Sequence, residues 1–293
     1  MLNLGSMQIR NPIVASSGAL AFGRAYGWER PLSYIGILRL NEIGMIITKT
    51  LTLNPRIGNF TGRNPWQVLS PIKGGWVNAF GLTNRGIDWF IQKEYPKVKG
   101  VNLVVSISGE KPENIVAIVK KINKLDILGI EINLSCPNTP DWIKWQEDFD
   151  LTRMTLLSAK VISKHPIIVK IGYQDEVTRK EFKKILEYAE IDAVDMINTI
   201  PFNNLYPDKK SPLLLGGGIS GSIIKEHALE QVGWFAQNCK LPIIGGGGIN
   251  NIYDVGDFLE CGATAVSIGS AHIMRPWIST KLVREYRINK INN

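Results

Sequence analysis

The sequence predicts an α/β protein, a (β/α)8 barrel of the TIM type that forms a single domain over residues 1–293, with a long insertion after its second strand. Eight short apolar runs alternate with helix-like stretches along the chain, as parallel strands joined by helices do. The runs are almost continuously apolar, which is typical of strands buried on both faces. No G-x-G-x-x-G motif follows the first run, so an open doubly wound sheet ranks well below the barrel.

The elements follow one another in a regular order. The predicted strands are Ile13–Ala15, Met45–Lys49, Leu103–Ile107, Gly129–Leu134, Ile167–Ile171, Ala193–Ile197, Leu241–Ile244 and Ala265–Ile268. The predicted helices are Leu32–Ile43, Pro112–Ile122, Leu151–Ser163, Arg179–Ala189, Lys225–Asn238 and Ile252–Cys261. A chain of 293 residues, 44% of them apolar, suits one barrel-sized core, and no linker or short repeat divides it.

The net charge of +8 raises the question of a nucleic-acid partner. The basic residues are dispersed over helix-like segments, where charged side chains form a solvated outer face, so we expect no nucleic-acid site. No apolar run approaches the length of a membrane span, and residues 1–10 lack the apolar region of a signal peptide. We therefore expect a cytoplasmic protein with no membrane partner.

Cysteine and histidine give no sign of a disulfide framework or a metal site. The three cysteines, at positions 136, 239 and 261, are widely and irregularly spaced. The three histidines, at positions 165, 227 and 272, lack metal-ligand spacing, and we interpret each as structural.

The stretch GIEINLSCPN at 129–138 is the most informative in the chain. Pro137 cannot donate a backbone hydrogen bond and stops the fourth strand near Cys136. This leaves two carboxamides, Asn133 and Asn138, beside the thiol at the carboxyl end of a strand, where α/β barrels build their active sites. Carboxamides can hold a flat polar ligand while a thiol moves a proton. The alternative is an inert Cys next to a turn.

Other strand ends add polar groups to the same edge. The first strand leads into the small residues ASSG at 15–18, which let a ligand approach the backbone. Lys49 and Lys170 end the second and fifth strands, and two cations at one site require something anionic or electron-rich between them. The alternative is that the Lys49 side chain extends away from the site into solvent. Glycine runs after the seventh and eighth strands are placed as the phosphate sites of such barrels are.

The run NLSCPN at 133–138 resembles the catalytic motif of the class 1 dihydroorotate dehydrogenases, FMN enzymes of pyrimidine synthesis, and the resemblance extends from residue 11 to residue 270. It implies oxidation of (S)-dihydroorotate to orotate on the route to UMP. Cys136 would remove the C5 proton and the C6 hydride would pass to flavin N5. A Cys base, with no N-terminal membrane-docking extension, points away from the class 2 enzymes.

The resemblance also assigns site residues. Substrate would be held by Lys49, Asn78, Ala79, Phe80, Gly81, Leu82, Asn133, Asn138, Asn198 and Thr199. FMN would be held by Ser17, Lys49, Thr50, Asn133, Lys170, Ile197, Gly221, Gly247, Gly248, Gly269 and Ser270. No metal is implied. The long segment 51–84 would cover the substrate, with a structural hairpin as the alternative.

The electron acceptor is a separate question. The segments at 22–24, 55–59 and 74–82 resemble the NAD-linked class 1B type, which pairs with an iron–sulfur/FAD electron-transfer subunit. The chain has no cysteine cluster for such a centre, so that centre would lie on another chain. We expect a homodimer with this further partner, and a self-sufficient homodimer that reduces fumarate is the alternative.

The loop Thr139–Asp150 departs from the family pattern. Trp142 and Trp145 could form an aromatic lid there or an ordinary packed turn. Two related flavin barrels stay open as functions. A tRNA dihydrouridine synthase would suit the basic charge, but the chain leaves little room after the eighth strand for an RNA-binding domain. A dihydropyrimidine dehydrogenase-like enzyme would act on a substrate without the carboxylate.

Overall fold

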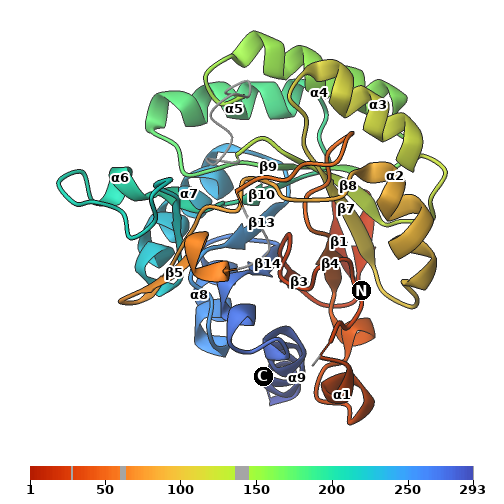
Figure 1. Cartoon of the computed structure of the whole chain (residues 1–293), viewed down its shortest axis with the longest axis vertical. Helices are drawn as coiled ribbons and strands as arrows, with labels where there is room; N and C mark the ends of the chain where they lie inside the picture. The colour runs from red at the N-terminus through yellow and green to blue at the C-terminus, as the bar shows by residue number, and fades with distance from the viewer. Residues whose placement is uncertain (28, 60–63, 136–144, 293) are drawn as a thin grey trace.

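The computed structural model describes residues 1–27, 29–59, 64–135 and 145–292. Eight parallel strands close into a barrel, which confirms the predicted fold (Figure 1). In chain order they are β3 (Ile13–Ala15), β4 (Met45–Ile47), β7 (Leu103–Ile107), β8 (Gly129–Asn133), β9 (Ile167–Lys170), β10 (Ala193–Met196), β13 (Ile243–Gly246) and β14 (Ala265–Ile268). The barrel closes where Val266 of β14 pairs with Ile13 of β3.

Helices surround the barrel, and in Figure 1 α3, α4 and α5 lie along one side of it. The helices are α1 (Glu29–Tyr34), α2 (Ile87–Trp89), α3 (Pro112–Ile122), α4 (Phe149–Ile162), α5 (Glu176–Tyr188), α6 (Phe202–Leu205), α7 (Lys225–Asn238), α8 (Ile252–Glu260) and α9 (Ile278–Asn292). Helix α3 buries Ile115, Ile118, Val119 and Ile122, the face that its periodicity predicts.

One predicted helix is wrong. In place of a continuous helix over 32–43, the structure has the short α1 and a separate 3-10 turn, Leu40–Glu42. Gly36 lies between them at a φ of +74°, outside the helical region. Helix α1 buries none of its own residues, and Tyr34 is 88% exposed. An apolar pattern alone therefore overestimated the length of this helix.

A small hairpin closes the end of the barrel where the strands begin. Strands β1 (Leu2–Leu4) and β2 (Met7–Ile9) are antiparallel. Leu4, Met7 and Ile9 are fully buried against apolar residues of the barrel strands, including Val14 and Ile168. Burial of these side chains excludes water from one end of the barrel, so ligands can enter only from the other.

A second sheet lies at the open end and confirms the insertion predicted after the second strand. It contains β5 (Leu69–Ile72), β6 (Gly75–Asn78), β11 (Ile200–Pro201) and β12 (Gly218–Ser220), in the order β11-β12-β6-β5. The first two belong to the 51–84 segment, and the other two follow the sixth barrel strand. The cover is thus built from two distant segments, of which the sequence indicated only the first.

Among the described residues, no helix is long and apolar enough to cross a membrane. Within the same part of the chain, no three His, Cys, Asp or Glu side chains gather as a metal site would require. Of the described cysteines, Cys239 is buried, Cys261 is half-buried, and both are free.

Candidate active site

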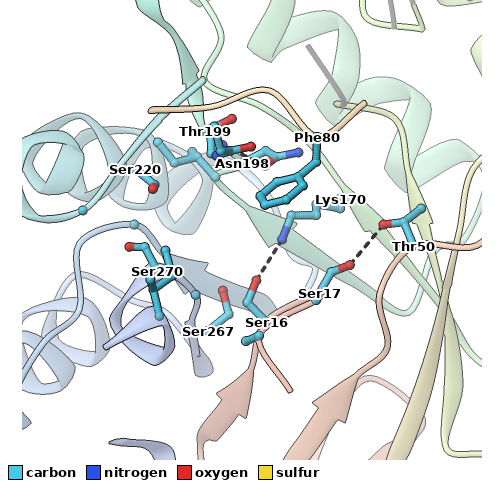
Figure 2. Close-up of a pocket in the computed structure, with 18 of the residues that line it drawn as sticks. Ser16, Ser17, Thr50, Phe80, Lys170, Asn198, Thr199, Ser220, Ser267 and Ser270 are labelled. Carbon is cyan, nitrogen blue, oxygen red and sulfur yellow. Dashed lines mark hydrogen bonds between the residues drawn. The ribbon is translucent and has the colours of Figure 1, made fainter. Parts of the chain in front are cut away.

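A cavity of about 350 Å³ opens at the carboxyl ends of the barrel strands, beneath the second sheet. Figure 2 shows residues from the barrel and from the second sheet facing one another across it. Most predicted site residues line it: Ser17, Lys49, Thr50, Asn78, Phe80, Gly81, Leu82, Asn133, Lys170, Ile197, Asn198, Thr199, Gly221, Gly247, Gly248, Gly269 and Ser270. Residues from nine separate segments of the sequence thus line one cavity.

Three predicted residues do not line the cavity in the described structure. Cys136 and Asn138 lie outside the described residues. Ala79 is fully buried, and its backbone N–H donates to the carbonyl of Val68, 2.8 Å away. Trp142, one of the two candidate lid residues, is also outside the described residues, whereas Trp145 is 3% exposed and packs in the main core. Trp145 is therefore a packed residue rather than a lid.

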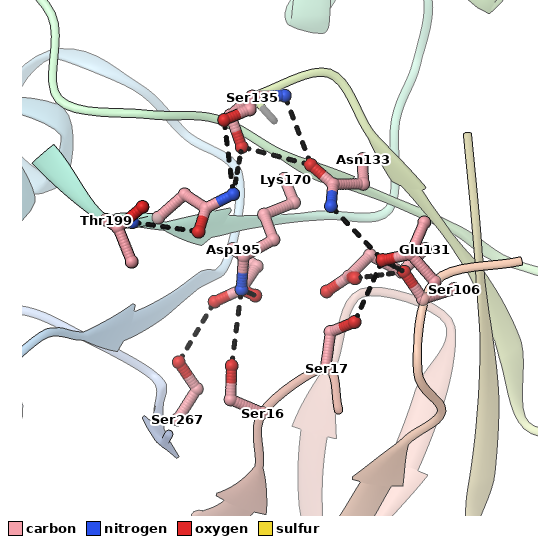
Figure 3. Close-up of polar contacts among 12 residues, drawn as sticks. Ser16, Ser17, Ser106, Glu131, Asn133, Ser135, Lys170, Asp195, Thr199 and Ser267 are labelled. Atoms are coloured by element: carbon pink, nitrogen blue, oxygen red, sulfur yellow. Dashed lines mark hydrogen bonds and ion pairs between the residues drawn. The ribbon is translucent and has the colours of Figure 1, made fainter. Parts of the chain in front are cut away.

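The two described carboxamides of the floor, Asn133 and Asn198, are joined through Ser135. The Ser135 backbone N–H and hydroxyl both contact Asn133 Oδ1 at 3.1 Å. Asn198 Nδ2 donates to the Ser135 carbonyl at 3.2 Å, and its Oδ1 accepts from the Thr199 N–H at 2.8 Å (Figure 3). These bonds hold both amides at defined orientations and constrain the residue that directly precedes Cys136.

A chain of hydroxyls continues from Asn133 along the floor. Asn133 Nδ2 donates to Thr50 Oγ1 at 3.2 Å, and Thr50 Oγ1 lies 2.9 Å from Ser106 Oγ. Ser17 Oγ lies 3.1 Å from Thr50 Oγ1 and donates to the Thr48 carbonyl. Thr50 therefore links the first, second, third and fourth barrel strands at the edge of the cavity, and its hydroxyl is already engaged.

The charged residues that line the cavity are both cations. Lys49 is half-buried with its Nζ 5.6 Å from the centre of the Phe80 ring, a cation–π contact. Lys170 is 4% exposed, and its Nζ reaches towards Ser16 Oγ at 3.3 Å (Figure 2). With no acidic residue among the described lining, the cavity favours anionic ligands.

Two buried acids beneath the floor escaped the sequence analysis. Lys170 Nζ donates to Asp195 Oδ2 at 2.6 Å, and Glu131 Oε1 accepts from Ser106 Oγ at 2.6 Å. Burial raises the pKa of the Glu131 carboxyl to about 8. Burial opposes the charge of Lys170, but the neighbouring carboxylates of Asp195 and Glu131 raise its pKa overall. Glu131 and Asp195 each lie in an otherwise apolar strand, and this position could have indicated from the sequence that both are buried and need a partner.

Glycine-rich loops form the side of the cavity next to β13 and β14. Gly247 has a φ of +125°, and a Cβ there would lie 2.8 Å from the Ala228 Cβ, so this position requires glycine. Gly269 differs, because a Cβ there would meet nothing nearer than the Ser16 Cβ at 3.8 Å. An added methyl at Gly269 would therefore leave the surrounding protein uncrowded.

Two further lining residues, Ser16 and Gly18, belong to the small-residue run at 15–18 that the sequence placed beside the ligand. The lining residues without a sequence signal are Ala19, Leu69, Ser220, Ile224, Ile249, Ser267 and Ile273. Leu69 and Ser220 belong to the second sheet, whose strands are too short to be recognised in sequence.

His272 supports the loop after β14 from behind. Its Nδ1 lies 3.2 Å from the Gly269 carbonyl, which can only accept, so Nδ1 carries the proton. Ser279 Oγ then donates to Nε2 at 3.1 Å. Burial lowers the pKa of His272 from 6.5 to about 4, so the imidazole is neutral in the folded protein. The structural interpretation of this histidine agrees with the geometry.

Comparisons with known proteins agree with one another. A family model described as dihydroorotate dehydrogenase matches residues 2–288. A relative from Bacteroides thetaiotaomicron, named dihydroorotate dehydrogenase B (NAD(+)), catalytic subunit, is 32% identical over 288 residues, which cover 96% of this chain and 90% of that protein. A relative of the same name from Geotalea uraniireducens is 34% identical over 282 residues, covering 94% of this chain and 88% of that protein.

A solved structure shares the fold. DHODH from Eimeria tenella, in complex with ferulenol, superposes with a TM-score of 0.74 and covers 96% of this chain and 81% of that chain. Its sequence identity is 19%, so this similarity supports the architecture alone.

The buried neutral His272 predicts an acid-sensitive fold. The pKa of His272 is 6.5 in the unfolded chain and about 4 in the folded protein. The contribution of this residue to the free energy of unfolding is therefore complete above pH 6.5 and is lost as the pH falls to 4. The loss attributable to this residue is about 3 kcal/mol at most. In urea denaturation of wild type and His272→Asn between pH 4 and pH 8, we expect the difference in unfolding free energy to narrow towards pH 4. If the unfolding free energies of wild type and His272→Asn instead differ by the same amount at every pH, His272 does not titrate as its burial implies.

Proposed function

This chain belongs to the dihydroorotate dehydrogenase family, and on that basis we propose that it oxidises (S)-dihydroorotate to orotate with FMN, on the route to UMP, as the catalytic subunit of an NAD-linked enzyme. One observation supports this function above the others. The glycine loops after β13 and β14, the carboxamides of Asn133 and Asn198, and the cations Lys49 and Lys170 all line one cavity.

The residues present fit FMN. Backbone N–H groups at Gly247, Gly248, Gly269 and Ser270 lie on the side where barrels of this kind bind phosphate, with glycine allowing close approach. Lys170 brings a buried positive charge to the cavity floor, which suits a ring that becomes more negative on reduction. Bound FMN supplies the acceptor for the hydride that leaves the substrate.

The same floor fits a flat, anionic pyrimidine. Asn133 and Asn198 are held by Ser135 in orientations that present fixed donors and acceptors to a ring. Lys49, beside Phe80, is placed to attract a carboxylate. A substrate carboxylate distinguishes dihydroorotate from dihydrouracil, so this cation favours the former.

We assign proton removal to Cys136, on the resemblance and on its position directly after Ser135. The thiol would take the C5 proton, which the neighbouring carbonyl acidifies, while the asparagines hold the ring. A free thiol has a pKa of about 8.5, and a neighbouring cation would favour the thiolate. Asn138, which follows closely in the sequence, completes the proposed amide set.

The names of the relatives support NAD as the final electron acceptor. The curated relatives are named as NAD(+)-type catalytic subunits, a name that implies a second subunit. We propose that the partner carries iron–sulfur and FAD centres and that two copies of this chain pair. The cytoplasmic location expected from the sequence also stays a prediction.

The phosphate loop can be tested at Gly269. An Ala at this position leaves the empty chain uncrowded but places a methyl in the cavity, so we expect Gly269→Ala to weaken FMN binding at least about tenfold. Gly256→Ala is the matched control, because a Cβ there meets nothing within 4 Å and Gly256 lies outside the cavity. Flavin fluorescence titration measures both. Unchanged affinity in a folded Gly269→Ala protein would contradict this placement of the phosphate.

The role of Cys136 can be tested by its removal. We expect Cys136→Ala to bind FMN normally and to slow flavin bleaching by dihydroorotate about 10²–10⁴-fold, because only proton abstraction is lost. Cys261→Ala, at a free half-buried cysteine far along the chain, should bleach at the wild-type rate. Stopped-flow absorbance gives both rates. Bleaching of Cys136→Ala at the wild-type rate would exclude this residue as the base.

The acceptor can be tested with the isolated chain. Without the second subunit, we expect dihydroorotate to reduce an artificial dye but not NAD, because the described residues gather no cluster that could hold an iron–sulfur centre. Steady-state assays with dye, NAD and fumarate separate the possibilities. Efficient NAD reduction by this chain alone would remove the need for the partner, and fumarate reduction would favour the self-sufficient alternative.

A further inference from the structure

Beneath the cavity floor, three charged side chains share one sealed layer of the barrel interior. Lys170, Asp195 and Glu131 come from β9, β10 and β8, and β9 pairs with both of the other strands. The two acids are fully buried, and the Lys170 side chain is 5% exposed. The proposed reaction uses Lys170 only, and gives no role to the acids.

Both oxygens of the Asp195 carboxyl accept a hydrogen bond from a described residue. Its Oδ2 accepts from Lys170 Nζ at 2.6 Å, and its Oδ1 accepts from Ser267 Oγ at 3.1 Å (Figure 3). Asp195 therefore forms the ion pair that balances the charge of Lys170. This pair alone would make the layer neutral.

Glu131 adds a second acid to a layer that holds a single cation. Its Oε1 accepts from Ser106 at 2.6 Å, but its Oε2 is buried with no donor among the described residues. The Asp195 carboxyl lies close enough to act on Glu131, because its charge and a hydrogen bond between the two carboxyls add to burial in raising the pKa of Glu131. Two carboxylates cannot hydrogen-bond unless a proton lies between them, and an unpaired buried charge costs several kcal/mol.

We propose that Glu131 and Asp195 share one proton, and that this proton sets the charge beneath the flavin site and thereby the affinity of the bound flavin for electrons. The second half of this inference rests on the proposed function, because it requires FMN in the cavity. Glu131 and Asp195 act through Lys170 and are positioning residues.

The shared proton makes the layer a pH-dependent element. When the shared proton is present, the positive charge of Lys170 cancels the single negative charge of the two acids. When the proton is lost, both acids are negative and the layer carries a net charge of −1. Burial raises the pKa of Glu131 to about 8, so the change occurs near that pH. The adjacent strands contribute hydroxyls, Ser16, Ser106 and Ser267, and the other charged group lining the cavity is Lys49. An added negative charge disfavours the reduced flavin.

The proton itself can be detected without flavin. At neutral pH, exposed carboxyls are ionised, so we expect wild-type protein to show the infrared carbonyl band of a buried carboxylic acid, lost as the pH rises through about 8. Glu131→Gln should lack this band. In Asp195→Asn, Glu131 becomes the counter-ion of Lys170 and the band should be absent at neutral pH. Absence of the band in wild type, or its persistence in Glu131→Gln, would overturn the shared proton.

The effect on the flavin needs a second measurement. We expect the FMN reduction potentials of wild type and Glu131→Gln to agree at pH 6.5. Above pH 9, the ratio of reduced to oxidised flavin at fixed potential should be about tenfold lower in wild type. If the FMN reduction potentials of wild type and Glu131→Gln agree at every pH in this range, the shared proton has no effect on the affinity of the flavin for electrons. A protein that binds no FMN would contradict the proposed function instead, and the infrared result would still decide the proton.

Discussion

The active site depends on one constraint, the closure of the barrel by the pairing of β14 with β3. Closure brings the carboxyl ends of eight strands to one rim, so residues as distant in sequence as Ser16 and Lys170 come within 3.3 Å. The β1–β2 hairpin seals the opposite end with Leu4, Met7 and Ile9. Because the barrel has no free edge and the hairpin fills one end, the described residues leave the cavity beneath the second sheet as the place where a ligand can meet the strand ends.

Rigidity at the rim comes from shared polar groups rather than from separate contacts. Ser135 joins Asn198 to Asn133, Asn133 joins Thr50, and Thr50 joins Ser106, which bonds Glu131 (Figure 3). Each member is buried or half-buried, so breaking one bond would leave a partner unsatisfied in a poorly solvated place. The network thus couples the amides that line the cavity to the charged layer beneath its floor.

The sequence predicted the features that depend on neighbouring residues, such as single strands and helices. All eight barrel strands, the exact bounds of α3 and α7, and the family were predicted and are confirmed. Long-range partners were not predictable: Asp195 and Glu131 meet only because β10 and β8 both flank β9. The short strands β11 and β12 gave no periodic signal, and Gly36 ended a helix that an apolar pattern extended. Cys136 stays a prediction from sequence alone.

The most direct test of this account is an anaerobic titration of the purified wild-type chain with dihydroorotate, followed by visible absorbance. We expect a yellow protein that dihydroorotate bleaches stoichiometrically without any added acceptor. Dihydrouracil, which lacks the carboxylate, should leave the protein yellow. A chain without a flavin spectrum, or one bleached equally by dihydrouracil, would contradict the assignment of this cavity to dihydroorotate oxidation.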